Sequence, residues 1–98
     1  GEDAGAFLEM KVGPMTPELM AQYRVKEPIG VVIEALEEAS PLAEKGVQPG
    51  ALVIMVNDEE TRSVAAYNRS MQKALKNKKA VLHIRRGSAV YPVGVELK

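Results

Sequence analysis

The sequence predicts a single α+β domain in which a small mixed sheet is closed by two main helices. Short apolar runs recur between glycine, proline and asparagine residues, which is typical of strands joined by turns. Two other segments carry apolar residues at helical spacing. With 98 residues, of which 46% are apolar, the chain is expected to form one compact domain and no second one.

The first predicted strand spans residues 6–12 and ends at a Gly-Pro pair. Thr16 follows and can cap a helix, with Pro17 at the first helical position, where its missing N–H costs no hydrogen bond. We expect this helix to end near Arg24 and to bury one side, formed by Leu19, Met20 and Tyr23.

The second predicted strand, residues 31–36, is almost continuously apolar, as is typical of a strand inside a sheet. Ser40 then caps a short helix that begins with proline, and Gly46 supplies the left-handed residue that ends it. A Pro-Gly pair reverses the chain into a third strand, residues 52–56, which leads to an Asn-Asp turn.

The longest predicted helix is capped by Ser63 and runs over residues 64–76. Its apolar residues recur at helical spacing: Val64, Tyr67, Met71 and Leu75. Strands over residues 80–86 and 89–97 then flank Gly-Ser and predict a hairpin, in which Pro92 marks the second strand as edge-like or bulged. The carboxylates before this helix, Asp58, Glu59 and Glu60, are predicted to be solvated.

Four stretches resemble PDZ domains of the bacterial type, and one of them, residues 80–97, AVLHIRRGSAVYPVGVEL, is similar to their C-terminal hairpin. Residues 40–58, SPLAEKGVQPGALVIMVND, resemble the core signature of that family. Residues 8–19, LEMKVGPMTPEL, are similar to the opening of PDZ domains from HtrA-type or Deg-like serine proteases, and residues 63–75, SVAAYNRSMQKAL, are similar to their long helix. The resemblance implies a circularly permuted PDZ domain over residues 1–98, a partly open barrel of five to six strands, excised from a larger protease.

The resemblance also implies a site for an extended C-terminal peptide, which adds as a strand between the first strand and the long helix. The N–H groups of Leu8, Glu9 and Met10 would bind the peptide carboxylate. The implied peptide-binding residues are Phe7, Leu8, Glu9, Met10, Lys11 and Val12 on the strand side and Val64, Asn68 and Met71 on the helix. Because the lining is apolar and rich in methionine, an apolar peptide tail is expected, whereas Tyr67, Leu75 and Met55 are assigned to the core.

Glu9 stands where the family loop normally has glycine, so its side chain restricts φ and places a negative charge near the bound carboxylate. Because Glu9 would weaken binding of a peptide carboxylate, a second function is also considered. In that alternative, the chain is a structural or oligomerisation PDZ domain whose groove is degenerate or occluded.

The composition argues against several other functions. Lysine plus arginine and aspartate plus glutamate number 13 each, so no net charge attracts nucleic acid. The sequence has no cysteine and one histidine, His83, which is expected to be exposed or half-exposed on the face of its strand with Val81 and Arg85; no metal site or cofactor is predicted. No apolar stretch is long enough to insert into a membrane.

No nucleophile motif accompanies His83, so the domain is predicted to be non-catalytic. The family implies that the parent protein is a serine endopeptidase of protein quality control. Its partners would be peptide or unfolded-protein C-termini and the parent's protease domain, with a homo-oligomer formed through the parent. A bacterial periplasm or cell envelope, or an organelle of bacterial origin, is the implied location.

Overall fold

The structure is a computed structural model that describes residues 8–97. Its strands are β1 (Met10–Pro14), β2 (Val31–Leu36), β3 (Leu52–Val56), β4 (Glu59–Glu60), β5 (Lys79–Arg86) and β6 (Ala89–Glu96). Its helices are α1 (Pro17–Gln22), α2 (Pro41–Glu44) and α3 (Val64–Asn77).

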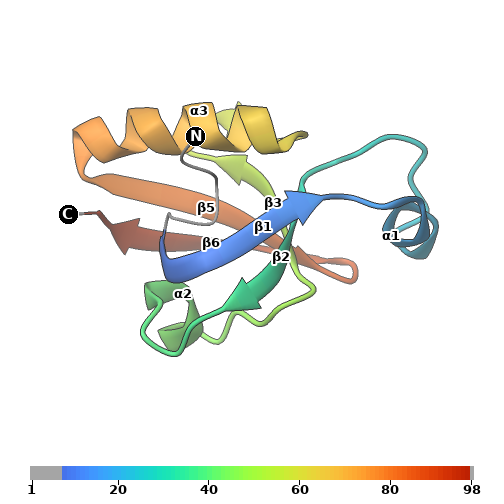
Figure 1. Cartoon of the computed structure of the whole chain (residues 1–98), viewed down its shortest axis with the longest axis horizontal. Helices are drawn as coiled ribbons and strands as arrows, with labels where there is room; N and C mark the ends of the chain where they lie inside the picture. Colours follow the sequence, from blue (N-terminus) through green and yellow to red (C-terminus); the bar gives the residue numbers. More distant parts are fainter. Residues whose placement is uncertain (1–7, 98) are drawn as a thin grey trace.

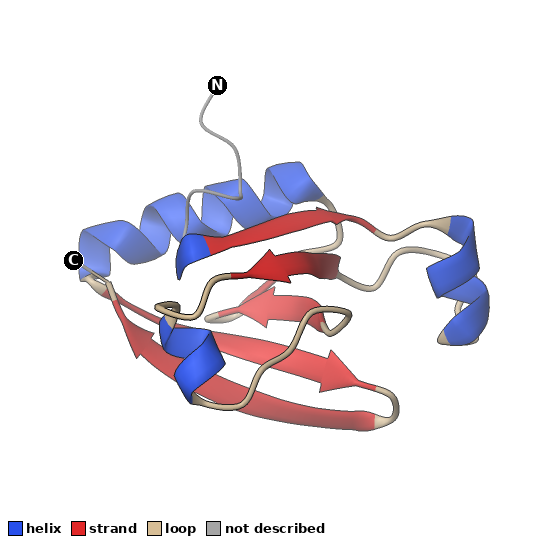
Figure 2. Ribbon diagram, turned by 60° about the horizontal axis from the view of Figure 1, so that its bottom comes forward, coloured by secondary structure: helices blue, strands red, loops and turns tan. Residues whose placement is uncertain are grey.

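The strands form one six-stranded sheet in the order β1-β2-β3-β5-β6, with β4 paired to β3. Every pairing in residues 8–97 is antiparallel. The long helix α3 lies along one side of the curved sheet, α1 lies at one end and α2 packs near β6 (Figures 1 and 2). The predicted α+β architecture is confirmed, with a third helix, the short α2, beside the two main ones.

The predicted limits of β2 and β3 are those of the structure, whereas the first strand is displaced along the chain. It runs over Met10–Pro14 instead of residues 6–12. Leu8 and Glu9 have φ values of 59° and 53°, which lie outside the extended region. The left-handed backbone of these two residues therefore delays the start of the strand; residues 6 and 7 lie outside the described part.

All three predicted helix caps are present. The side-chain oxygens of Thr16, Ser40 and Ser63 accept hydrogen bonds from backbone N–H groups in the first turn of each helix, at 3.2, 3.2 and 3.1 Å. Gly46 has the expected positive φ, 88°. In the turn after β3 the left-handed residue is Asn57, whose φ is 55°. Local side-chain chemistry therefore sets where these elements begin and end.

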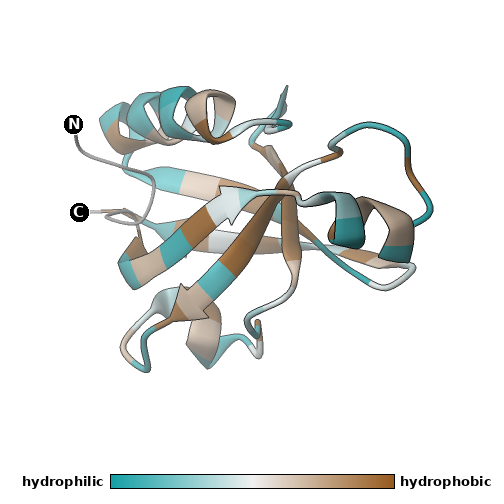
Figure 3. Cartoon of the chain, turned by 45° about the vertical axis from the view of Figure 1, so that its right-hand side comes forward, coloured by the Kyte–Doolittle hydropathy of each residue, from teal (hydrophilic) through white to brown (hydrophobic). Residues whose placement is uncertain are grey.

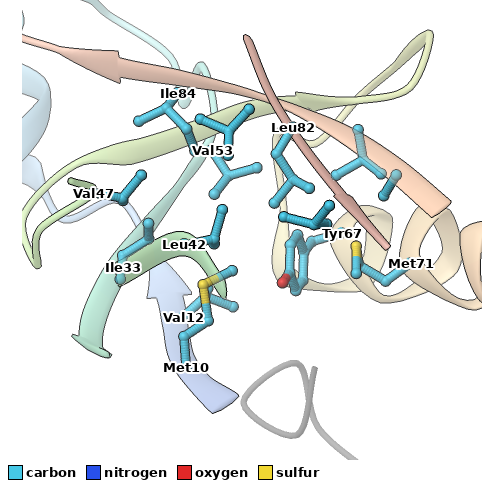
Figure 4. Close-up of a cluster of buried hydrophobic side chains, with 14 of the residues drawn as sticks. Met10, Val12, Ile33, Leu42, Val47, Val53, Tyr67, Met71, Leu82 and Ile84 are labelled. Atoms are coloured by element: carbon cyan, nitrogen blue, oxygen red, sulfur yellow. The ribbon is translucent and has the colours of Figure 1, made fainter. Parts of the chain in front are cut away.

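The apolar side chains form two clusters, because successive residues of β2 and β3 point to opposite faces of the sheet. The larger cluster lies between the sheet and α3 and includes Ile33, Val53, Tyr67 and Leu82 (Figure 4). The smaller cluster contains Met15, Val32 and Leu52, with Leu19, Met20 and Tyr23 of the α1 region packed on it half-buried. The predicted inward side of α1 is thus confirmed. Figure 3 shows the hydrophilic residues along α3.

Two predictions about the core are wrong. Leu75 is 38% exposed, and Ala74 occupies the buried position at that turn of α3. Met55 is only half-buried and belongs to neither cluster. A bulge in the β3–β5 pairing leaves Ile54 without a partner and sets Met55 opposite His83 on the outer face.

Of the two possibilities predicted for the last strand, the edge strand is confirmed, since within residues 8–97 β6 pairs only with β5. The N–H of Leu97 donates to the carbonyl of Lys78 at 2.8 Å, which defines a hydrogen-bonded pair at that end of the ladder. Because such pairs alternate with non-hydrogen-bonded ones, Pro92 and His83 form a non-hydrogen-bonded pair. The nitrogen of Pro92 therefore faces the free edge. His83 is half-buried, as expected.

Candidate functional site

Strand β1 is the other edge of the sheet. It pairs with β2 on one side, and α3 packs beside it on the other (Figure 1). A bulge leaves Glu34 of β2 without a partner between Lys11 and Val12. The edge of β1 that faces α3 is paired with no other strand in the described part of the chain.

The backbone groups of Met10 point toward this free edge. The N–H of Glu37 donates to the carbonyl of Glu9 at 3.1 Å, so Glu9 and Glu37 form a hydrogen-bonded pair. The next pair, Met10 and Leu36, is therefore non-hydrogen-bonded. The N–H and C=O of Met10 are directed away from β2, which is the orientation that a further strand requires.

The loop before β1 carries two successive left-handed residues, Leu8 and Glu9. Leu8 is half-buried against the larger cluster, and Glu9 is exposed. Glycine adopts such a backbone without steric cost, whereas a residue with a Cβ loses about 1 kcal/mol there. The Glu9 position thus has the backbone conformation for which a glycine is suited. Phe7 lies outside the described residues.

The apolar side chains of β1 join the larger cluster. Met10 and Val12 are 2% and 8% exposed, and Figure 4 shows them on the same side of the strand. Lys11 points to the opposite face, where its ammonium group lies 3.9 Å from the carboxylate of Glu34. The strand therefore offers apolar side chains on one face and a charged pair on the other.

The three helix residues predicted for the site lie on α3. Val64 is half-buried at the start of the helix and packs on the larger cluster. Met71 belongs to that cluster and is 0% exposed. Asn68 is half-buried, and its side-chain oxygen is buried without a hydrogen-bond partner in the structure. Beside them, burial raises the pKa of the Tyr67 hydroxyl above its usual value of 10, so this group stays protonated at neutral pH.

A polar network that the sequence analysis missed holds α3 to β4. Ser70 donates to one carboxylate oxygen of Glu59 at 2.8 Å, and the ammonium group of Lys73 lies 2.6 Å from the other. Hydrogen bonds from Lys73 and Ser70 lower the pKa of Glu59 below its usual value. Glu59 is exposed, as predicted, but it also takes part in this network. The signal for the network was Ser70, a hydroxyl at a buried helix position that needs a partner.

The described residues show no other chemistry at this edge. In residues 8–97, no three histidine or acidic side chains are grouped so that they could hold a metal ion. The helices of the same segment are too short or too polar to cross a membrane. What the edge of β1 does present is the outward-pointing backbone groups of Met10, beside the half-buried and buried apolar side chains of α3.

Comparison with known proteins identifies the family. The family model described as "PDZ domain" matches residues 32–86, more than half of the chain. The chain belongs to the PDZ domain family. Since the match is to a PDZ domain, the prediction of a non-catalytic domain is confirmed.

This PDZ domain is similar to part of two proteins called "Probable periplasmic serine endoprotease DegP-like". The relative from Chlamydia trachomatis is 29% identical over 91 residues, and the relative from Chlamydia muridarum is 28% identical over the same length. Each alignment covers 92% of this chain but only 18% of the relative, so the chain spans less than a fifth of their length.

Two solved structures share the fold. The HtrA-type protease AlgW with a decapeptide gives a TM-score of 0.72 at 22% identity, over 92% of this chain and 27% of that one. The HtrA3 PDZ domain bound to the phage-derived ligand FGRWV gives a TM-score of 0.64 at 22% identity. This match covers 90% of this chain and 85% of that one. The predicted resemblance to PDZ domains of HtrA-type and DegP-like proteases is confirmed.

Proposed function

We propose that this PDZ domain binds an extended, apolar C-terminal peptide by β-strand addition to β1. One observation carries the proposal: the backbone groups of Met10 point toward a free sheet edge that lies beside α3. A peptide laid along this edge exchanges main-chain hydrogen bonds with β1, while its alternate side chains meet the helix.

The proposed contact residues remain those predicted from the sequence: Phe7, Leu8, Glu9, Met10, Lys11, Val12, Val64, Asn68 and Met71. Their chemistry fits an apolar tail, because the described side chains that share the larger cluster are aliphatic or methionine. Leu8 and Val64 are the half-buried members of that cluster from the two walls. A peptide side chain would extend the cluster between them.

The proposal extends to the protein from which the domain derives. The relatives are called periplasmic serine endoproteases, and this chain covers 18% of their length. We infer that the domain, residues 1–98, belongs to a larger serine endopeptidase of the periplasm or cell envelope. There it would present peptide or unfolded-protein C-termini to the protease domain, within a homo-oligomer built by the parent, as part of protein quality control.

A structural role is the second candidate, and the burial of two predicted site residues favours it. Met10 and Met71 are 2% and 0% exposed and belong to the core in the present conformation. Glu9 adds a negative charge where a peptide carboxylate would bind. In this reading the groove stays occluded and the domain contributes to assembly.

Titration with the peptide FGRWV, the ligand of the HtrA3 PDZ domain, separates the two candidates. Amide shifts should map to residues 8–12 and 64–71, with a weak dissociation constant of about 1–100 μM. A peptide N-methylated at alternate positions cannot donate to β1 and should lose binding. If FGRWV leaves these amides unchanged while light scattering shows self-association, the structural role is supported.

A matched pair of variants locates the site. Val64→Glu places a charge in the apolar wall but suits the first turn of a helix, where acidic residues are stabilising. Val90→Glu makes the same change at a valine of β6 that is 51% exposed. Only Val64→Glu should abolish peptide binding. Equal losses in both variants would place the peptide elsewhere.

A further inference from the structure

A pocket lies between the end of α1 and the β5–β6 turn. Figure 1 shows these two segments at the same end of the molecule. The pocket is a hollow of about 360 Å³ lined by Gln22, Tyr23, Arg24, Arg85, Gly87 and Ser88. None of these residues belongs to the proposed peptide groove. The lining brings two guanidinium groups, an amide and a hydroxyl to one place.

The Arg85 guanidinium is held in place before any ligand arrives. Its central carbon lies 5.3 Å from the centroid of the Tyr23 ring, a cation–π contact. Its Nε donates to the carbonyl of Gly87 at 2.9 Å. These two contacts restrain the side chain and leave its terminal amino groups to form a fork, the arrangement that binds carboxylates with two parallel hydrogen bonds.

Arg24 reaches the same hollow from an unusual backbone position. At the end of α1, the N–H of Arg24 donates to the carbonyl of Ala21 at 3.1 Å, and the N–H of Val25 donates to that of Met20 at 2.9 Å. This is the Schellman pattern, in which the left-handed residue is usually glycine. The left-handed residue here is Arg24, with φ of 59°.

Helix α2 ends in the same pattern and provides an internal comparison. The N–H of Gly46 donates to the carbonyl of Ala43, and the N–H of Val47 donates to that of Leu42, both at 3.1 Å. The left-handed residue in α2 is glycine, with φ of 88°. The same turn therefore closes with glycine in α2, whereas in α1 it carries an arginine that lines the hollow.

These arginines have no acidic partner in the described chain. The three ion pairs of residues 8–97 join Lys11 to Glu34, Arg62 to Glu60 and Lys73 to Glu59. Although the net charge is zero, residues 61–95 contain no aspartate or glutamate. They contain eight cations, Arg62, Arg69, Lys73, Lys76, Lys78, Lys79, Arg85 and Arg86. Arg85 belongs to this segment, about a third of the chain, in which positive charge is in excess, so the local charge favours an anion.

We propose that the hollow binds a carboxylate side chain from an acidic segment of another polypeptide. The guanidinium fork suits carboxylate and phosphate alike. No helix N-terminus, the usual phosphate site, contributes to the lining.

The test is an amide-shift titration of the full chain with the peptide Gly-Glu-Glu-Gly-Glu-Glu-Gly, acetylated and amidated so that it has no terminal carboxylate. Amides of Gln22, Arg24, Gly87 and Ser88 should shift. Arg85→Gln should weaken binding about fivefold, as expected for loss of a guanidinium–carboxylate pair. Arg69→Gln, which removes the same charge from α3, should weaken it less than about twofold.

Arg24→Gly provides a variant in which lost binding is not explained by unfolding, because glycine suits the left-handed Schellman position. This variant should raise the melting temperature of the domain and still weaken its binding of the acidic peptide. A peptide with glutamine in place of glutamate should not bind. The proposal is overturned if Arg69→Gln weakens binding as much as Arg85→Gln, if the glutamine peptide shifts the same amides, or if inorganic phosphate shifts them while the acidic peptide does not.

Discussion

Glu59 and Lys73 join β4 to α3, with a carboxylate oxygen and an ammonium nitrogen 2.6 Å apart. Ser70 donates to the other carboxylate oxygen, so a two-residue strand holds two successive turns of the long helix. Because α3 is one wall of the proposed groove, this network contributes both to stability and to the position of that wall.

The first prediction concerns the pH dependence of this network. The pKa of Glu59 is lowered from its usual value of 4.5 in the folded state, so its stabilising contribution is present above pH 4.5 and is lost as the pH falls through the folded pKa. At pH 7, Glu59→Gln should unfold at a lower urea concentration than the unaltered chain. The gap should close on acidification below pH 4.5.

Glu38→Gln is the control, since Glu38 is exposed and forms no ion pair with the described residues. Its urea midpoint should follow that of the unaltered chain at each pH. A gap for Glu59→Gln that persists unchanged at pH 3 would show that the carboxylate charge does not contribute.

The second prediction compares two neighbours on β3. Leu52 is 0% exposed, whereas Ile54 is half-buried at the bulge. Leu52→Ala should therefore cost about 2–5 kcal/mol of unfolding free energy, and Ile54→Ala should cost less than Leu52→Ala. Chemical denaturation of the two variants measures the difference. The reverse order would contradict a bulge at Ile54.

The third prediction tests the end of α2. Gly46→Ala introduces a Cβ at φ of 88° and should cost about 1 kcal/mol, although nothing lies within 4 Å of the new atom. Gly94 has the same open space and no positive φ. Gly94→Ala should change stability by less than about 0.5 kcal/mol. Equal effects in thermal unfolding would contradict a role for the backbone conformation.

The fourth prediction concerns Glu9 and rests on the proposed peptide groove. Glu9→Gly relieves a left-handed backbone and removes a negative charge beside the site. A peptide with a free carboxylate should bind more tightly by about 0.5–1.5 kcal/mol, and the gain should shrink with salt. Calorimetry with the amidated peptide is the control; an equal gain there would assign the effect to the loop conformation alone.

Most of the fold was predictable because its signals are local. Thr16, Ser40 and Ser63 cap helices through hydrogen bonds within one turn, and Gly46 ends a helix through its own φ. The bulge at Ile54 was not predictable, since it depends on how β3 pairs with β5 across the sheet. The bulge changes the face of the sheet to which the following residues point, and Met55 therefore lies outside the core.

The two proposed sites, the peptide groove and the arginine-lined hollow, also differ in how far the sequence could predict them. The loop at Leu8 and Glu9 was identified through its resemblance to a known motif, which supplied the place of the missing glycine. The contact between Tyr23 and Arg85 joins residues far apart in the sequence. No local pattern indicates that contact, and equal numbers of acidic and basic residues concealed how unevenly they are distributed along the chain.

The outward-facing nitrogen of Pro92 makes the two edges of the sheet unequal. A strand that approached β6 would find no N–H at the middle of that edge, whereas the edge of β1 has no proline before Pro14. Two copies of the domain therefore cannot join β6 of one to β1 of the next in an uninterrupted ladder. The interruption at Pro92 hinders end-to-end growth of the sheet, which keeps the open edge of β1 compatible with high concentrations of the protein.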